Sequence, residues 1–395
     1  MKIGILTYHD SYNFGANLQT LATQEMLRKL GHQPVVVNYV DVPKRDAFAR
    51  LVKPEQIAEH EKFAARYYAL GPEITDPARV GDYVREELDG VVSGSDAVFR
   101  LMTPYEPARV AKKLLGRANP YESFSWGDRV PPFFLPFDAP GVVKGSIAAS
   151  SRGTSFYWLK PHMMRDVGNA LRQFDFVTVR DDWTGTLVKW LSRGKVQPLY
   201  SPDPVFGLNA AFATPQDELP QQDLSDVILL NGEFDNAWLR RMVTAIRARG
   251  YRAVTLANPS EGHALDFVDG ELSLPMSPLT WFKALGSCAG FIGMRFHAMV
   301  SCMTGKTPVV TMDVTRPRWG KPDPRNPNHD LARRSGIMDR YFYSRDLFAA
   351  DPGRVMDLLF DPATQARADA FADAAPDLLF GHLSRFEQHA ASKGA

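Results

Sequence analysis

The fold is decided by residues 3–40, which open with Ile3-Gly4-Ile5-Leu6-Thr7 and close with Pro34-Val35-Val36-Val37-Asn38-Tyr39-Val40. Both ends of this stretch are short apolar runs of the kind found in buried strands. Between them, apolar residues recur at helical spacing: Leu18, Leu21, Ala22, Met26, Leu27 and Leu30. Gly31 then ends the predicted helix. A strand, a helix and a second strand form a β-α-β unit, so the sequence predicts an α/β fold with a largely buried parallel sheet.

The same alternation continues on both sides of residues 212–226, a polar and proline-bearing stretch that we interpret as a linker. Before the linker, the pattern predicts strands at 90–96, 142–150 and 176–180 and helices at 161–173 and 182–191. After it, the pattern predicts strands at 227–230, 251–256, 290–294 and 308–312 and helices at 236–249, 278–287 and 297–304.

This order predicts two Rossmann-like domains that face each other across a cleft, an architecture of the glycosyltransferase-B-like kind. The N-terminal domain is predicted over residues 1–211, with a charged helical excursion from the sheet at residues 44–89. The C-terminal domain is predicted over residues 227–350, and C-terminal helices over residues 351–395. A length of 395 residues also favours two domains over one.

Composition excludes several classes of function. The net charge of +1 gives no overall field that would attract nucleic acid or an anionic membrane. The two cysteines, Cys288 and Cys302, lie in apolar segments and are expected to be packing thiols of a reducing compartment. The start of the chain does not resemble a signal peptide, and no apolar run approaches the ~18 residues of a membrane helix. We therefore expect a cytoplasmic protein without an integral membrane segment.

Two further site types are not expected. The first β-α turn contains the single glycine Gly15 where a dinucleotide-binding turn would have G-x-G-x-x-G, so a nicotinamide enzyme is not predicted. No group of His, Cys and Asp residues has metal-ligand spacing, so neither a metal nor a cofactor is expected.

The strongest candidate site begins where the strand at 290–294 runs into Arg295, Phe296 and His297 and then into a helix of small residues. The carboxyl end of a strand in an open α/β sheet is where ligands bind. Arg295 offers a planar fork for a carboxylate or phosphate, and His297 can exchange a proton near neutral pH. The alternative is that Arg295 pairs with a carboxylate while His297 packs in the core.

Two further candidates follow earlier strands. Asn13, Asn17 and Gln19 begin the first helix, where amides and free backbone N–H groups suit an anion or a sugar hydroxyl. The alternative is an N-cap with a tight turn. Ser95 and Asp96 end the strand at 90–96, where Asp96 serves either as a general base or as the cap of the next segment.

Several other positions allow two interpretations. Arg180 ends a strand. It either binds an anionic substrate or pairs with Asp181 and Asp182, which follow it in the sequence. Asp203 lies between two prolines and is a catalytic carboxylate or part of a structural turn. A basic, aromatic loop contains Arg316, Arg318 and Lys321. This loop either closes over phosphates or is a solvated surface loop. The aromatic run at 133–137 is expected to be a core strand or its approach, rather than a sugar platform.

Taken in order, these motifs resemble the polysaccharide pyruvyl transferase family. The matching pieces are YNFGANLQ at 12–19, VSGSD at 92–96, AAS at 148–150, VTVRD at 177–181, DPV at 203–205 and RFH at 295–297. The resemblance implies a glycosyltransferase-B-like fold and transfer of a pyruvate unit from phosphoenolpyruvate to sugar hydroxyls as a cyclic ketal. It places Arg295 and His297 on the pair that holds the donor and supplies acid catalysis, with Phe296 between them, and Arg180 on a donor-binding arginine.

The chain departs from the family pattern in places that bear on the acceptor. Ser151-Arg152-Gly153 stands where an aromatic residue and glycine are usual, and Arg180-Asp181 stands where Arg-Glu is usual. Residues 44–89 and 313–330 match no family pattern. The implied partners are phosphoenolpyruvate and a sugar or glycan acceptor of a cell-surface or exopolysaccharide glycan. A lipid-linked acceptor would bring the protein to the inner membrane.

The chemistry also needs a group that deprotonates the acceptor hydroxyl, and Asp96 is the first candidate. A nucleotide-sugar glycosyltransferase of the same architecture is the alternative function. It would need a carboxylate for the ribose or base in the C-terminal domain, and Glu261 and Asp266 are the candidates, although neither lies in a motif. A catalytically silent sugar-binding protein is disfavoured because Arg295 and His297 are both present at a strand end.

Overall fold

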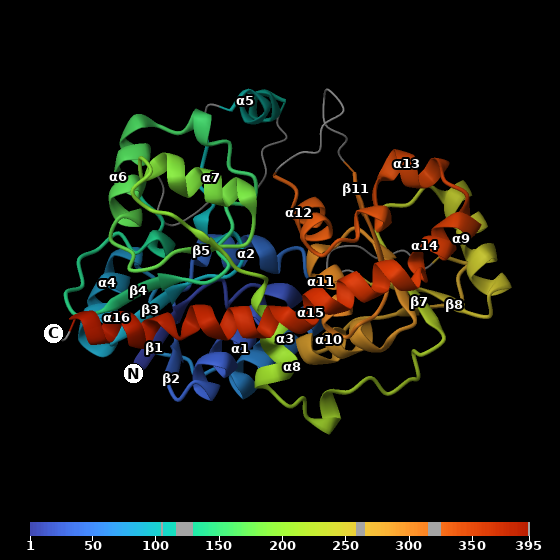
Figure 1. The fold of residues 1–395 in the computed structure, drawn as a ribbon, viewed down its shortest axis with the longest axis horizontal. Coiled ribbons are helices and arrows are strands. Elements are labelled where there is room, and N and C mark those ends of the chain that lie inside the picture. The colour runs from blue at the N-terminus through green and yellow to red at the C-terminus, as the bar shows by residue number, and fades with distance from the viewer. Residues whose placement is uncertain (104–105, 116–128, 258–264, 315–324, 394–395) are drawn as a thin grey trace. The chain divides into compact units, whose positions relative to one another are not determined.

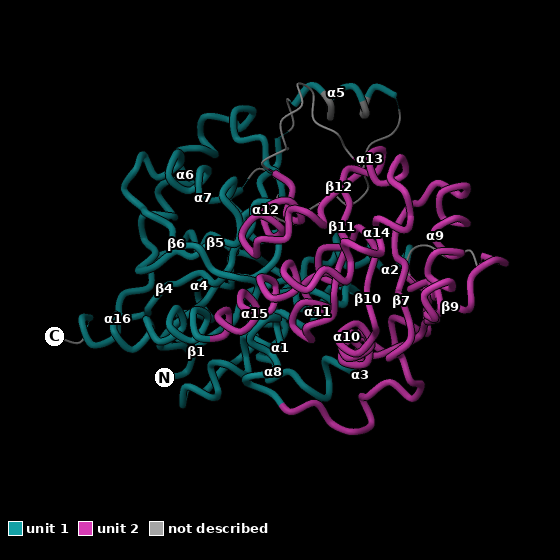
Figure 2. Tube along the Cα trace, turned by 45° about the vertical axis from the view of Figure 1, so that its right-hand side comes forward, with its two compact units in different colours: residues 1–51, 63–212, 377–395 teal, residues 52–62, 213–376 magenta. Residues whose placement is uncertain are grey.

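The computed structural model describes residues 1–103, 106–115, 129–257, 265–314 and 325–393. The chain forms two compact units, each with its own parallel sheet (Figure 2). Unit 1 comprises residues 1–51, 63–212 and 377–395, and unit 2 comprises residues 52–62 and 213–376. The division at 212/213 falls where the predicted linker begins. Two other assignments differ from the predicted domains, because residues 52–62 pack with unit 2 and residues 377–395 pack with unit 1.

Unit 1 contains a four-stranded parallel sheet in the order β2-β1-β3-β4 (Figure 1). The strands are β1 (Lys2–Leu6), β2 (Gln33–Val36), β3 (Gly90–Ser93) and β4 (Val143–Ser146). A smaller parallel pair, β5 (Thr178–Val179) and β6 (Leu199–Tyr200), joins β4 through isolated bridges. The helices are α1 (Phe14–Lys29), α2 (Val42–Ala49), α4 (Val80–Glu87), α5 (Pro107–Leu114), α6 (Pro161–Leu171), α7 (Asp182–Leu191), α8 (Leu208–Ala211) and α16 (Arg385–Lys393). Helix α3 (Pro54–Tyr67) begins in unit 2 and ends in unit 1.

Helix α1 is buried almost throughout, which its sequence pattern did not indicate. Asn13 caps its first turn by accepting a hydrogen bond from the Ala16 N–H at 3.2 Å, and Gly31 follows its end with φ of 82°. Every residue from Phe14 to Leu27 is buried. The polar residues of this helix must therefore bond within the protein, because a buried polar group without a partner is costly.

The last helix of the chain completes unit 1. Phe386 of α16 is fully buried, and its ring lies 5.1 Å from that of Phe176 in an edge-to-face contact. A side chain at Gly90 would lie 2.9 Å from Phe386, so this glycine lets α16 approach β3 closely. Lys393 forms an ion pair with Asp175 at 2.7 Å.

Unit 2 contains a six-stranded parallel sheet in the order β12-β11-β10-β7-β8-β9. The strands are β7 (Val227–Asn231), β8 (Arg252–Leu256), β9 (Gly270–Leu272), β10 (Gly290–Gly293), β11 (Val309–Asp313) and β12 (Tyr341–Tyr343). The helices are α9 (Asn236–Ala248), α10 (Pro278–Ser287), α11 (Phe296–Thr304), α12 (Pro327–Arg334), α13 (Ser344–Ala349) and α14 (Pro352–Leu359). Helix α15 (Pro362–Leu383) begins in unit 2 and ends in unit 1. One face of the sheet packs Ile228, Leu230, Ile292, Val310 and Met312 against apolar residues of α9 and α14.

The structure confirms most predicted elements and corrects some. Three strands, β6, β9 and β12, were missed, because runs of two or three residues give too little alternation to detect. The expectation of a core strand at 133–137 is wrong. Pro132–Phe134 form a 3₁₀ turn, and Leu135 has a left-handed φ of 49°, although Phe133 and Phe134 are core residues as expected. Cys288 and Cys302 are buried free thiols, as predicted.

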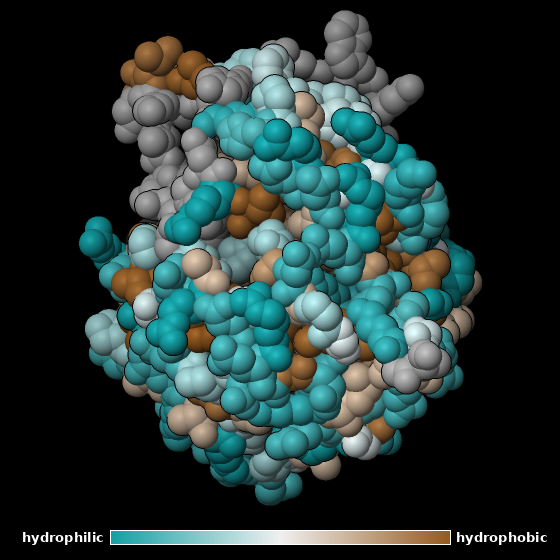
Figure 3. All heavy atoms as spheres, turned by 90° about the vertical axis from the view of Figure 1, so that its left-hand side faces the viewer, coloured by the Kyte–Doolittle hydropathy of each residue, from teal (hydrophilic) through white to brown (hydrophobic). Residues whose placement is uncertain are grey.

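On the face seen in Figure 3, hydrophilic residues predominate and hydrophobic residues are scattered. Scattered surface apolar residues are normal for globular proteins. In the described parts of the chain, no helix combines the length and the apolar character needed to cross a bilayer.

Candidate active site

Arg295, Phe296 and His297 lie where β10 ends and α11 begins. Gly293 ends β10, and a side chain there would lie 2.5 Å from both the Asn231 carbonyl oxygen and the Phe291 ring. Glycine is therefore required for β10 to pack this closely against β7 at its carboxyl end. This fit fixes the point at which the chain leaves the sheet and presents Arg295.

Arg295 occupies the N-cap position of α11, but its side chain does not cap the helix. The side chain is exposed, whereas Phe296 and His297 on the first turn are half-buried, with their rings 5.2 Å apart and edge-to-face. His297 is thus not fully enclosed in the core, whereas the alternative interpretation of the sequence required it to be. The arrangement sets a guanidinium and an imidazole beside the N–H groups of a helix N-terminus, which together favour an anion.

A polar cluster behind this turn was not predicted. Asn328 of α12 donates from Nδ2 to the Met294 carbonyl oxygen at 2.9 Å and to Asp313 Oδ1 at 3.1 Å. Burial raises the pKa of the Asp313 carboxyl, and this effect outweighs favourable polar interactions with Tyr341, Asn326 and Asn328. Met294 immediately precedes Arg295, so the cluster is joined to the candidate site through the backbone.

In unit 1, the structure brings four predicted residues together in one buried network. Gln19 donates from Nε2 to Ser95 Oγ at 2.9 Å and to Asp203 Oδ2 at 2.6 Å. Arg180 donates from NH1 to the same Asp203 oxygen at 2.9 Å. The side chains of Arg180 and Asp203 are 9% and 1% exposed, so this ion pair is largely shielded from solvent.

The network corrects the expected partner of Arg180. Asp181 instead caps α7 by accepting from the Thr184 N–H at 2.7 Å, and it accepts from the Ser150 hydroxyl at 2.8 Å. Asp203 also accepts from the Val205 N–H at 3.1 Å. The expected structural turn at Asp203 is therefore confirmed, and the same carboxylate orients Arg180.

Asn13 and Asn17 have structural contacts separate from this network. Asn13 is the predicted N-cap of α1. Asn17 is buried, and its Nδ2 donates to the His9 carbonyl oxygen and to the Tyr68 hydroxyl, both at 3.1 Å. Of the three polar residues predicted at this helix N-terminus, Gln19 contacts the candidate residues Ser95 and Asp203.

Asp96 lies in a second cluster of unit 1. Its φ of 70° is left-handed, and its side chain makes no capping hydrogen bond to the following 3₁₀ turn, so the prediction that it caps this segment is wrong. The Lys44 ammonium nitrogen lies 2.8 Å from the centre of the Tyr8 ring. Burial lowers the pKa of Lys44 to about 7, opposed by the charges of Asp96, Asp10 and Asp41. A lysine that can be neutral near pH 7 therefore interacts with the candidate general base.

Lys44 gives a testable dependence of stability on pH. Its pKa is lowered from 10.5 to about 7, so between these values the unfolded chain holds the proton that the folded protein has released. The free energy of unfolding should therefore rise with pH across this window, and the cost of the buried charge is fully present below it. Lys44→Met should flatten the rise, as measured by chemical denaturation across the window. Lys53→Met, at an exposed lysine, should leave the slope as it is; equal slopes in both variants would refute the assignment.

Of the remaining predicted residues, Asp266 is the one that lies in the described parts of the chain. Arg316, Arg318, Lys321 and Glu261 lie outside the described residues. Asp266 is highly exposed and lies 3.6 Å from Arg240 in a surface ion pair.

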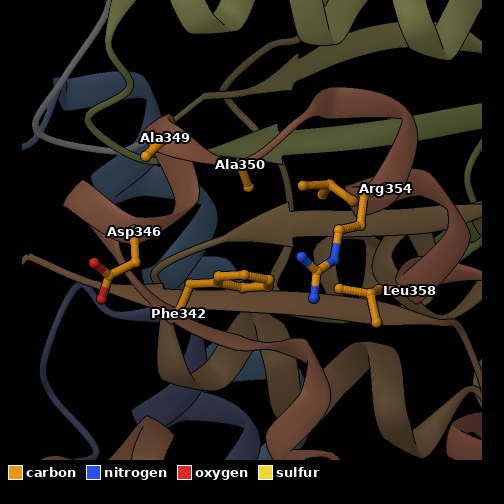
Figure 4. Close-up of a pocket in the computed structure, with 7 residues that line it drawn as sticks. Phe342, Asp346, Ala349, Ala350, Arg354 and Leu358 are labelled. Atoms are coloured by element: carbon orange, nitrogen blue, oxygen red, sulfur yellow. The ribbon is translucent and has the colours of Figure 1, made fainter.

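A pocket of about 260 Å³ in unit 2 lies apart from the predicted residues. Phe342, Asp346, Arg354 and Leu358 are among its lining residues (Figure 4). Side chains alternate along a strand, so Phe342 points to the opposite face of β12 from Tyr341 and Tyr343. The pocket is thus on the other side of the sheet from the Asp313 cluster.

Two signals in the sequence would have found most of the residues that were missed in these clusters. Tyr8, Asp41 and Asp96 each follow a strand of one parallel sheet, and the carboxyl ends of such strands share an edge. Lys44 comes only three residues after Asp41. Asp313 likewise ends β11 beside β10, but nothing in the sequence showed that Asn328, from a helix 15 residues further on, would bond to it.

Comparison with known proteins identifies the family of the chain. A sequence profile described as polysaccharide pyruvyl transferase matches residues 13–316, which is most of the chain. Among curated proteins, no sequence relative of the chain is detected.

Similar solved structures show the fold. The UDP-GlcNAc 2-epimerase from Neisseria meningitidis, bound to UDP-GlcNAc, matches with a TM-score of 0.52 and 11% identity over 98% of this chain and 100% of that chain. The glycosyltransferase SnogD from Streptomyces nogalater matches with a TM-score of 0.47 and 13% identity over 99% of each chain. The spinosyn forosaminyltransferase SpnP has a TM-score of 0.47 and 11% identity, again over 99% of each chain. The predicted glycosyltransferase-B-like fold is confirmed by the structure itself, which has two α/β units, each with a parallel sheet.

Proposed function

Because the chain belongs to the polysaccharide pyruvyl transferase family, we propose that it moves a pyruvate unit from phosphoenolpyruvate to two hydroxyls of one sugar. The observation that carries this proposal is the exposed Arg295 and the half-buried His297 at the N-terminus of α11. Phosphoenolpyruvate carries a carboxylate and a phosphate on one alkene. A guanidinium fork and helix N–H groups are well matched to such a dianionic donor.

The reaction sets definite demands on the side chains. A proton must reach the methylene carbon of the donor, and one sugar hydroxyl must attack the adjacent carbon and lose its proton. Phosphate then leaves, and a second hydroxyl of the same sugar closes the ketal and loses its proton in turn. We assign the proton donor to His297 and the binding of the donor anions to Arg295, beside Phe296.

We assign two roles to unit 1. Arg180 binds the donor, and its guanidinium is held in one orientation by Asp203. Asp96 accepts a proton from the acceptor hydroxyl, and the neighbouring Lys44 supports this role because its amine can itself be neutral near pH 7. In this proposal Gln19 holds the Asp203 carboxylate in place, and Gln19 is itself held by its bond to Ser95. No step is assigned to a metal or an organic cofactor.

The acceptor is proposed to be a sugar of a cell-surface or exopolysaccharide glycan, or its lipid-linked precursor. The family match supports a sugar or glycan as the acceptor. Synthesis of such precursors from phosphoenolpyruvate would place the reaction in the cytoplasm, at the inner membrane where the acceptor is lipid-linked.

Phosphoenolpyruvate is expected to stabilise the folded protein, whereas uridine and cytidine diphosphate sugars are not. A ligand present at a hundred times its dissociation constant adds about 2.7 kcal/mol to the free energy of unfolding. The shift in melting temperature should be lost in Arg295→Ala and reduced in Arg180→Ala. Arg240→Ala, which removes an exposed arginine of a surface ion pair, should keep it. Stabilisation by a nucleotide sugar alone would instead support a glycosyltransferase.

A further inference from the structure

Asn328 fixes the backbone that carries Arg295. It is the second residue of α12 and is 3% exposed. The Met294 N–H donates to the Asn231 carbonyl oxygen at 3.0 Å, and the Met294 carbonyl accepts from Asn328 at 2.9 Å. Both backbone polar groups of Met294 are therefore held, one by the neighbouring strand β7 and one by a side chain. The next residue along the chain is Arg295.

The chemistry of the cluster requires an amide at position 328. The Met294 carbonyl and the Asp313 carboxyl are both acceptors in these bonds, and only the NH₂ group of Asn328 can donate to both at once. Asp313 ends β11 and is 8% exposed, so it holds the amide in one orientation from a rigid strand. The Asn328 backbone N–H also donates to Asn326 Oδ1 at 3.1 Å, which fixes the start of α12.

The cluster is not an ordinary closed structural network. Within the described residues, Asp313 Oδ2 and Asn328 Oδ1 are buried and receive no hydrogen bond. Unsatisfied buried oxygens are uncommon, and each costs roughly 1–3 kcal/mol. These two unsatisfied oxygens offset part of the stability that the pair gains from its other hydrogen bonds.

We propose that Asn328, oriented by Asp313, is a positioning residue for the donor site, setting Arg295 through the Met294 carbonyl. This inference rests on the proposed function. Because donor binding depends on where the guanidinium lies, loss of the Asn328 amide displaces Arg295 without removing it. A displacement of about 1 Å at a binding group can cost up to ~10²-fold in rate.

The test compares three variants with the wild-type chain. Asn328→Ala should raise the Michaelis constant for phosphoenolpyruvate by about tenfold or more, with a smaller change in turnover number. The exchange Asp313→Asn with Asn328→Asp restores a bond between the two side chains but leaves no donor for Met294. It should recover melting temperature relative to Asn328→Ala while the Michaelis constant stays high. Asp330→Asn weakens the ion pairs that Asp330 forms with Arg333 and Arg334 within the same helix, and it should keep a wild-type Michaelis constant.

A second measurement makes the outcome independent of the substrate. Hydrogen exchange of the amides of residues 294–298 should be faster in Asn328→Ala than in the wild-type chain or in Asp330→Asn. A wild-type chain that neither binds phosphoenolpyruvate nor transfers pyruvate would refute the proposed function, and the exchange data would still decide whether Asn328 holds the turn. If the wild type is active, an unchanged Michaelis constant or unchanged exchange in Asn328→Ala would overturn the inference.

Discussion

His297→Ala is expected to slow pyruvate transfer by about 10²–10⁴-fold while changing the affinity for phosphoenolpyruvate much less. A positioned acid acts as the proton moves, so its loss falls on turnover rather than on ground-state binding. The side chain is half-buried on the first turn of α11, so its removal should cost little stability. Turnover and melting temperature should be measured on the same preparations.

The matched control for His297 is His162→Ala, which removes an exposed histidine from unit 1. We expect its turnover to match that of the wild type. A folded His297→Ala protein with wild-type turnover would remove the acid-catalyst assignment. A loss of activity that is explained by a lower melting temperature would instead indicate a packing role for the imidazole.

Asp203→Ala is expected to lower the free energy of unfolding by about 3–5 kcal/mol, because it removes the carboxylate from a largely buried ion pair. Gln19 also loses an acceptor at 2.6 Å, and the Val205 N–H loses its cap. Asp203→Asn should cost less, since the amide oxygen can still accept one of these bonds. Chemical denaturation of the full chain measures the difference.

A double-mutant cycle separates the ion pair from the other contacts of Asp203. Arg180→Leu combined with Asp203→Leu should destabilise the protein by clearly less than the sum of the two single changes. Additive losses would show that the two side chains do not stabilise each other. A separate binding measurement tests whether Asp203 is needed to orient Arg180, since Asp203→Asn should then weaken binding of phosphoenolpyruvate.

The strand and helix pattern was predictable because each element carries its own signal. The β-α-β unit at residues 3–40 and the strand that leads into Arg295 are local patterns, and the structure has both. The strand β12 was not predicted, because its three half-buried residues give no clear alternation. The prediction of a strand at 133–137 was wrong, because apolar content predicts burial but does not distinguish a strand from a 3₁₀ turn that begins at a proline.

The candidate residues could be predicted, but their partners could not. Arg180 was expected to pair with aspartates next to it in the sequence, whereas its partner Asp203 lies 23 positions away. Proximity in the sequence is a poor guide where a strand end and a turn meet in space. Asn328 carries no sequence signal for the same reason, since its role depends on where α12 packs.

The return of the chain's last helix to unit 1 affects how the protein can be made. Phe386 fills a space against Gly90 and Phe176, yet residues 377–395 are translated only after all of residues 213–376. On the ribosome, domains generally fold N-terminal first. Here the first unit to emerge stays open along β3 and β4 until the second has been synthesised. A nascent chain held at the linker should therefore expose apolar surface and depend on chaperones, even though most of its sheet is already present.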